Sequence, residues 1–280
     1  MSESSTMDFM LKDIPDDFIN GMCHDLAQYC IPMYQGTKLL GSGTLIQVDD
    51  AFGILTARHV LSAQTPPIIF QDSITEVIQL CIDRQWHHFT LPHAALSEIV
   101  IAEPVPGKKG ADLTFIRISD CEELEILKRK KGFWNLSDFT EDDHFDLSKP
   151  GLLCLTGYPA EKCGIRTDDK GNVELMSFCL GLTGFRDDIY VDEEFDYIEF
   201  TSHHGTNPDL PENYGGMSGG GLWHVNMTYG TKSKNFTYEH DSVQLCGVAF
   251  FQEHESEGVM KITGHGSQSL QLAIERIRAN

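Results

Sequence analysis

The sequence predicts a mostly β protein in which two groups of short strands lie between an N-terminal and a C-terminal helix. Short runs of branched and aromatic residues, separated by Gly, Pro, Asp or Ser, recur along most of the chain. This texture is typical of an antiparallel barrel or sandwich. The runs form two sets of about six, with a charged, helix-like stretch at 121–131 between them. We therefore expect an all-β fold built from two similar halves.

The terminal helices are expected from the spacing of apolar residues. From Phe18 to Tyr29 these residues recur at helical intervals, and a second such stretch at 267–277 closes the chain. The expected strands are 39–48, 52–56, 67–71, 77–82, 88–91, 99–102 and 113–118 in the first group, then 152–157, 173–182, 197–201, 220–225, 245–251 and 259–262 in the second. Surface loops are expected at 138–149, 187–195 and 203–214.

These expectations divide the chain into four parts. An N-terminal helical segment covers 1–36, the first β group 37–135, the second β group 136–266, and the C-terminal helix 267–280. Each β group is long enough to bury a core of its own.

The charge excludes one class of partner. The 280 residues include 21 Lys and Arg against 42 Asp and Glu, a formal net charge of −21. Nucleic-acid binders need a basic face that displaces counterions from phosphates, so no nucleic-acid partner is expected. The apolar runs are too short to span a bilayer, and the polar N-terminus lacks the features of a signal peptide. A cytoplasmic protein without membrane contact is expected.

We expect no metal and no cofactor. The eight cysteines are scattered, without the paired spacing that zinc sites use, and fit reduced thiols. The pairs His87-His88 and His203-His204 lack a third ligand at suitable spacing, which favours surface or structural roles.

Three short segments carry residues that suit one chemistry. His59 follows a strand-like run that ends in T-A-R, and Asp112 stands at the head of the apolar run L-T-F-I. Ser218 lies within G-G-M-S-G-G-G, a glycine-rich turn that leads into a strand. Each segment has an ordinary structural explanation by itself. Their joint presence, in the order His, Asp, Ser, indicates nucleophilic acyl transfer.

Acyl transfer accounts for each of these residue types. A serine hydroxyl is a weak nucleophile at neutral pH, so it needs an imidazole to take its proton and a carboxylate to fix the imidazole's tautomer. Ser218, His59 and Asp112 are therefore the candidate catalytic residues. The glycines permit a tight turn that aims two backbone N–H groups at one point, as an oxyanion hole requires. We expect Gly216 and Ser218 to supply those groups.

The blocks T-A-R-H-V, A-D-L-T-F-I and G-G-M-S-G-G resemble the signatures of the chymotrypsin/trypsin-like serine peptidases, most closely the bacterial, HtrA-like or trypsin-like peptidase domain branch. Further likeness lies in the G-Y-P run at 157–159 and in the strand at 245–252. The resemblance implies two six-stranded antiparallel β-barrels, with His59 and Asp112 from the first barrel and Ser218 from the second.

The chain departs from secreted members of that family in three places. Val60 and Tyr214 stand where those members have cysteines, which agrees with a reducing compartment. Met217 stands where they have the aspartate that pairs with a newly cut N-terminus. Activation by that cleavage is therefore not expected, and control would come from loop ordering, a partner or substrate supply.

The resemblance also implies a substrate-binding set made up of Glu212, Phe250, Phe251, Gln252 and Gly258. Glu212 occupies the place of the acidic pocket base in trypsin-type enzymes, which would favour cleavage after Lys or Arg. Glu212 is at least as consistent with a solvent-exposed loop residue. Phe250 and Phe251 would suit a small or apolar pocket. The sequence leaves both preferences open.

The function expected from the sequence is that of an intracellular serine endopeptidase acting on protein or peptide substrates through an acyl-enzyme. A narrow substrate set is expected because broad activity in the cytosol would be toxic, and a stress or antiviral defence setting with an activator or partner protein fits it. One alternative is a catalytically silent peptide-binding module on the same fold. Another, an esterase or other acyl transferase, needs a helix after its nucleophile, whereas a strand-like run follows Ser218.

Overall fold

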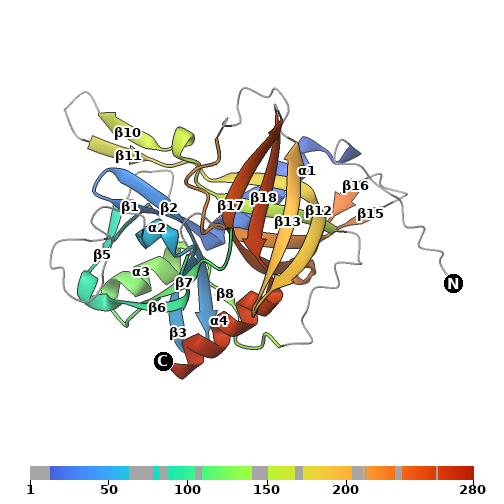
Figure 1. Cartoon of the computed structure of the whole chain (residues 1–280). Helices are drawn as coiled ribbons and strands as arrows, with labels where there is room; N and C mark the ends of the chain where they lie inside the picture. The colour runs from blue at the N-terminus through green and yellow to red at the C-terminus, as the bar shows by residue number, and fades with distance from the viewer. Residues whose placement is uncertain are drawn as a thin grey trace.

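Two antiparallel β regions that share an apolar core make up most of the structure (Figure 1). The structure is a computed structural model, and it describes residues 13–62, 78–81, 88–104, 109–140, 151–167, 173–203, 211, 213–230, 235–256 and 258–280. The blue to green strands of Figure 1 form the N-terminal region. The yellow to red strands β12 (Leu180–Asp192), β13 (Phe195–His203), β17 (Val243–Ser256) and β18 (Val259–His265) belong to the C-terminal region, and the blue helix α1 (Asp16–Leu26) lies beside the latter.

The N-terminal region is a sheet of eight strands. Its order is β5-β4-β1-β2-β3-β7-β6, with β8 pairing in parallel to β2. The strands are β1 (Cys30–Gln35), β2 (Lys38–Val48), β3 (Ala51–Thr56), β4 (Ile78–Cys81), β5 (His88–Leu91), β6 (Leu96–Ala102), β7 (Leu113–Ile118) and β8 (Trp134–Asn135). The end strands β5 and β6 do not pair with each other in the described part of the chain, so this sheet is open.

The C-terminal region is a closed ring of six antiparallel strands, in the order β12-β13-β18-β17-β14-β9. These strands are β9 (Gly151–Gly157), β12 (Leu180–Asp192), β13 (Phe195–His203), β14 (Gly221–Asn226), β17 (Val243–Ser256) and β18 (Val259–His265). Two separate hairpins join β10 (Gly164–Thr167) to β11 (Val173–Met176) and β15 (Thr228–Gly230) to β16 (Asn235–Thr237). Short 3-10 turns are η2 (Ala27–Tyr29), η3 (His93–Ala95), η5 (Ala160–Lys162) and η6 (His240–Ser242).

The expected terminal helices are confirmed. Helix α1 (Asp16–Leu26) buries Met22 and Leu26 and contacts β12 and β9, and helix α4 (Ser267–Ala279) crosses both regions at the bottom of Figure 1. The charged stretch between the strand groups is helix α3 (Glu122–Lys130), and the four-residue helix α2 (His59–Ser62) follows β3. None of the helices in the described ranges is long and apolar enough to cross a bilayer.

Three aromatic rings pack where the two regions meet. Tyr29 comes from the segment after α1, Trp134 from β8 and Trp223 from β14, and their centroids lie 5.1 to 5.3 Å apart. Trp223 is fully buried and donates its indole N–H to Thr156 Oγ1 at 3.0 Å. Packed aromatic pairs add stability beyond the area they bury, so this cluster fixes one region against the other.

The sequence expectation for the fold is confirmed in its coarser form, a mostly β chain with antiparallel sheets. Two details were wrong. The sheet begins at β1, within the segment that we assigned to the N-terminal helix, because the short apolar run of β1 contains a proline that obscures the strand pattern. The acidic stretch 187–195 is mainly the end of β12 and a tight turn at Glu193 (φ 57°), not a loop.

The acidic strand end is stabilised by pairing across the sheet. Tyr190 of β12 stacks on Tyr197 of β13 with centroids 5.1 Å apart, while Asp187, Asp188 and Asp192 of β12 are exposed. Cross-strand aromatic pairs stabilise a sheet where the local composition suggests a loop. One further expected strand, 173–182, is divided between β11 and β12, and the expected strand at 67–71 lies outside the described residues.

Candidate functional site

The N-terminal region brings His59 and Asp112 together through two hydrogen bonds. The imidazole Nδ1 of His59 lies 2.5 Å from Asp112 Oδ2, and the backbone N–H of His59 donates to Asp112 Oδ1 at 2.8 Å. The side chain of Asp112 is 7% exposed, whereas that of His59 is 36% exposed. Both carboxylate oxygens of Asp112 thus bind His59, and the His59 ring meets Asp112 through Nδ1.

Three elements of the N-terminal region position this pair. His59 begins α2, whose Val60 and Leu61 are buried beneath it, and Asp112 immediately precedes β7. Arg58 Nε lies 2.8 Å from Glu98 Oε1 on β6, which ties the turn before His59 to the neighbouring strand. Burial raises the pKa of Glu98, while the Arg58 charge opposes that rise.

The glycine-rich turn around Ser218 adopts backbone conformations that favour glycine. Gly216 has φ 95° and Gly219 has φ 90°, which is costly for residues with a Cβ. A Cβ on Gly216 would lie 2.7 Å from Tyr158 O, and one on Gly219 would lie 2.0 Å from Ser42 O. Two of the glycines therefore serve the geometry of the turn and its close approach to neighbouring backbone.

Strand β2 of the N-terminal region supports the turn that carries Ser218 through hydrogen bonds. Ser42 donates its N–H to Ser218 O at 2.9 Å and its hydroxyl to Gly216 O at 2.7 Å. Thr44 donates its hydroxyl to Gly219 O at 3.1 Å. The G-S-G-T run at 41–44 of β2 thus anchors the turn that carries Ser218.

Ser218 lies next to the helix that begins with His59. A Cβ placed on Gly41 would meet the Val60 side chain at 2.8 Å and the Ser218 carbonyl oxygen at 3.1 Å, so both lie against one point of β2. No hydrogen bond joins the Ser218 hydroxyl to His59 among the residues that the structure describes. Such contacts are often long in a free enzyme and tighten only when substrate binds.

Two N–H groups of the turn remain without a partner. The N–H of Met217 donates to Tyr214 O, and that of Gly219 donates to Ala249 O. The N–H groups of Gly216 and Ser218, on either side of Met217, donate to no atom within the described ranges. Unpaired N–H groups beside a hydroxyl can donate hydrogen bonds to an anionic oxygen.

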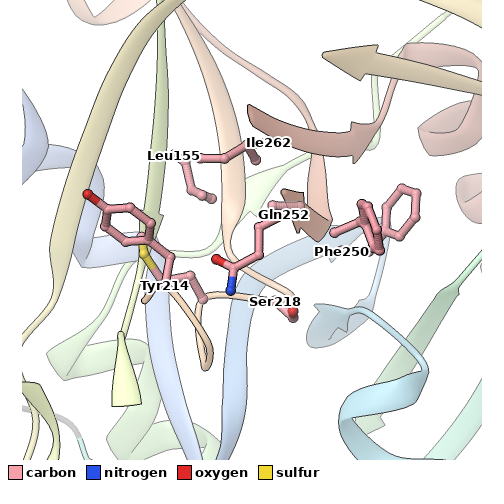
Figure 2. Close-up of a pocket in the computed structure, with 9 residues that line it drawn as sticks. Leu155, Tyr214, Ser218, Phe250, Gln252 and Ile262 are labelled. Carbon is pink, nitrogen blue, oxygen red and sulfur yellow. The ribbon is translucent and has the colours of Figure 1, made fainter. Parts of the chain in front are cut away.

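A small cavity of about 20 Å³ lies beside Ser218 (Figure 2). Its walls come from the three strands β9, β17 and β18 and from the segment that carries Ser218, and its lining residues are Leu155, Tyr214, Met217, Ser218, Ala249, Phe250, Phe251, Gln252 and Ile262. None of these lining residues carries a charge. The pocket therefore offers an apolar surface to any side chain that enters it.

Gln252 reaches into the space between Tyr214 and Ser218, as Figure 2 shows. Its side-chain amide donates to Asn213 Oδ1 at 2.8 Å, and the same oxygen accepts the N–H of Gly215 at 2.7 Å. The Asn213 side chain thus joins the strand beside the pocket to the beginning of the glycine-rich turn. Burial and the nearby Glu161 charge raise the pKa of Tyr214 to about 12, so its hydroxyl stays neutral.

Some of the predicted substrate-binding residues line the pocket beside Ser218, and others do not. Phe250, Phe251 and Gln252 line the pocket as expected. Gly258 does not line it: β17 continues to Ser256, which places Gly258 in the following turn at φ 72°. Glu212 lies outside the described residues, as do His87 and His204.

Sequence reasoning missed three contributors to the site. Ser42 and Asn213 act by hydrogen bonds to the glycine-rich turn, and His265 by a contact with the backbone of Asp112 at 3.1 Å. All three lie far from their partners or outside the signature blocks. Ser42 alone carried a signal, since it stands between two glycines in a strand.

Neither a protein-family model nor a curated protein sequence matches the chain.

Proposed function

We propose that the chain is a serine endopeptidase that cleaves protein or peptide substrates through an acyl-enzyme. Ser218 is the nucleophile, His59 the general base and acid, and Asp112 the carboxylate that orients His59. The observation that carries the proposal is the two-point contact of Asp112 with His59 beside a turn in which the N–H groups of Gly216 and Ser218 have no partner among the described residues.

The reaction follows from these positions. The Ser218 hydroxyl gives its proton to His59 Nε2 as its oxygen bonds to the substrate carbonyl carbon. The Gly216 and Ser218 N–H groups receive the negative charge that develops on the carbonyl oxygen. The carbon–nitrogen bond then breaks, the amine leaves with the proton from His59, and water activated by His59 releases the acyl group from Ser218.

A chymotrypsin-like arrangement of two barrels is part of the proposal. The closed six-stranded ring supports the second barrel, and the order of β1, β2, β3, β7 and β6 in the open sheet is compatible with an incomplete first barrel. In this arrangement the N-terminal region supplies His59 and Asp112, the C-terminal region supplies Ser218, and the reaction takes place where they meet.

The lining of the pocket favours cleavage after an apolar side chain. Lys or Arg would bury a charge against Met217, Phe250 and Ile262 with no counter-charge among the described lining residues, and an unpaired buried charge is costly. The substrate backbone would lie along Phe250–Gln252 as an added strand. We therefore expect peptides with an apolar residue before the scissile bond to be the better substrates.

A catalytically silent peptide-binding module is the second candidate. The missing hydrogen bond between Ser218 and His59 favours it, because the hydroxyl is then not activated in the free protein. The two candidates make opposite predictions about the reactivity of Ser218.

Labelling with a fluorophosphonate separates the two candidates. We expect the purified chain to form a covalent adduct at Ser218, identified by peptide mass spectrometry, and we expect none in Ser218→Ala. The matched control is Ser256→Ala, which removes an exposed hydroxyl at the end of β17 and should label at the wild-type rate. A folded wild-type chain that gives no adduct would establish the binding module instead.

A further inference from the structure

His265 is a buried histidine that contacts the backbone of Asp112 from the opposite region. It is the last residue of β18 and has no exposed surface. Its Nε2 lies 3.1 Å from both the backbone nitrogen and the backbone oxygen of Asp112, and the Asp112 N–H is directed at the ring. The residue that orients His59 is therefore held at two points, by its carboxylate on one side and by its backbone on the other.

The backbone N–H of Asp112 needs an acceptor from outside its own sheet. The ladder between β6 and β7 ends with the pair Ala102 and Leu113, so Asp112 stands one residue beyond it. Asp112 is also only 5% exposed, which keeps water from serving as a ready partner. A buried N–H without an acceptor is strongly disfavoured, and the His265 ring supplies the acceptor.

Aromatic side chains fix the plane of the His265 ring. Phe250 stacks on it with centroids 4.7 Å apart and an interplanar angle of 28°, and Tyr197 and Phe195 pack against it at 5.5 and 5.8 Å. Phe250 also lines the pocket beside Ser218. The ring is thus placed between the wall of the pocket and the backbone of Asp112.

The contact requires a neutral ring, since a protonated Nε2 has no lone pair with which to accept. Burial lowers the pKa of His265 to about 4, against the opposing charges of Asp112 and Asp196. With Nε2 accepting, the proton of the neutral ring is on Nδ1, which is buried and has no hydrogen-bond partner in the described part of the chain. The other tautomer would donate from Nε2 to Asp112 O. His265 thus contacts Asp112 through Nε2 although its Nδ1 has no hydrogen-bond partner among the described residues.

We propose that His265 is a positioning residue for the catalytic pair, a role that rests on the proposed peptidase function. By accepting the Asp112 N–H, it holds the Asp112 carboxylate where both of its oxygens reach His59. It touches neither the substrate nor the reacting atoms.

Two variants test this role through the rate of fluorophosphonate labelling at Ser218. His265→Phe keeps an aromatic ring against Phe250 but removes the acceptor, and we expect labelling to slow at least tenfold. His265→Gln can place an amide oxygen near the Asp112 N–H, and we expect it to restore labelling to within about threefold of the wild type. The matched control is His224→Phe, at a buried histidine of β14 that packs against Gly151, which should label at the wild-type rate.

A spectroscopic measurement reports on the pair directly. The proton between His59 Nδ1 and Asp112 should give a low-field proton NMR resonance in the wild type and in His265→Gln, and this resonance should shift or broaden in His265→Phe. A folded His265→Phe that labels at the wild-type rate would overturn the proposal. So would a slow His265→Phe that His265→Gln does not rescue, because the role would then be one of packing.

The wild-type protein provides a test that needs no variant and therefore survives any folding defect. The ring nitrogens of His265 should show the chemical shifts of a neutral imidazole with its proton on Nδ1. A proton on Nε2 at neutral pH would refute the accepting role. Absence of labelling in the folded wild type would instead refute the peptidase function, so the two failures are distinguishable.

Discussion

The two sides of the candidate site differ in how far their hydrogen bonds are satisfied. Both carboxylate oxygens of Asp112 are used on His59. In the turn that carries Ser218, by contrast, the N–H groups of Gly216 and Ser218 have no partner within the described residues. The contacts of Asp112 with His59 are therefore fully formed, whereas the turn that carries Ser218 keeps two N–H donors that no described residue uses.

Each region also supports, by hydrogen bonds, the part of the candidate site that the other region carries. His265, from the barrel, accepts the N–H of Asp112, and Ser42 and Thr44, from the open sheet, hold the turn that carries Ser218. Neither region therefore contains all the contacts that fix its own part of the site. The pairing of the two regions, and not either sheet alone, determines the geometry.

The largest effect on labelling should come from a variant that disrupts the contact between Asp112 and His59. Asp112→Asn puts an amide where a carboxylate accepts from both the backbone and the ring of His59, which favours the wrong ring tautomer. We expect labelling of Ser218 to slow by about 10⁴ with little loss of fold. Stopped-flow or gel-based labelling with a fluorophosphonate measures this rate.

The control for Asp112→Asn is Asp196→Asn. Asp196 is also buried and accepts hydrogen bonds from the N-terminal turn of α4 through Ser269 and Gln268. Its replacement should lower the melting temperature but leave the labelling rate near that of the wild type. Equal labelling by Asp112→Asn and the wild type would remove Asp112 from the mechanism.

The next largest effect on labelling should come from a variant of the turn that carries Ser218. Gly216→Ala places a Cβ against Tyr158 O at a φ of 95°, so the turn must shift and its N–H must change direction. We expect labelling to slow by about 10²–10³, the usual cost of losing one oxyanion-hole donor. Gly36→Ala is the control, because Gly36 also has a positive φ but nothing within 4 Å of its Cβ position.

A melting temperature that falls similarly in both glycine variants, with slow labelling only in Gly216→Ala, would separate backbone strain from a role in catalysis. Equal labelling by the two variants would argue against an oxyanion hole at Gly216.

The smallest effect concerns the contact between the two regions and depends on pH. The pKa of His265 is about 4 in the folded chain and close to 6.5 when unfolded. Because the folded pKa is depressed, its contribution to stability is complete above about pH 6.5 and decreases as the pH falls toward 4. This dependence amounts to about 3 kcal/mol over the full interval.

Denaturant titrations at several pH values, with wild type and His265→Gln in parallel, measure this dependence. The variant lacks the titrating ring, so its stability should decline less steeply than that of the wild type between pH 6.5 and pH 4. Parallel curves would mean that folding does not lower the pKa of His265.

The spacing of apolar residues was sufficient to predict most helices and strands. It failed where a strand is stabilised mainly by pairing with a neighbouring strand. The strands that contain Leu45, Phe115 and Leu155, and both terminal helices, follow from apolar periodicity, which is a property of neighbouring residues. The strand through Asp187 and Tyr190 was missed because its acidic composition indicates a loop, while its stability comes from a partner strand.

For the site, the sequence by itself determined which groups could react. The chemical needs of a serine nucleophile indicate His59, Asp112 and Ser218 as candidates without any coordinates, and glycine's lack of a Cβ indicates the turn. The tertiary structure decided which of these groups meet: the hydrogen bonds between His59 and Asp112, the support of the turn by Ser42, and the backbone contact of His265. Those contacts join residues up to 174 positions apart, and their distances depend on how the two sheets pack, which a local pattern does not encode.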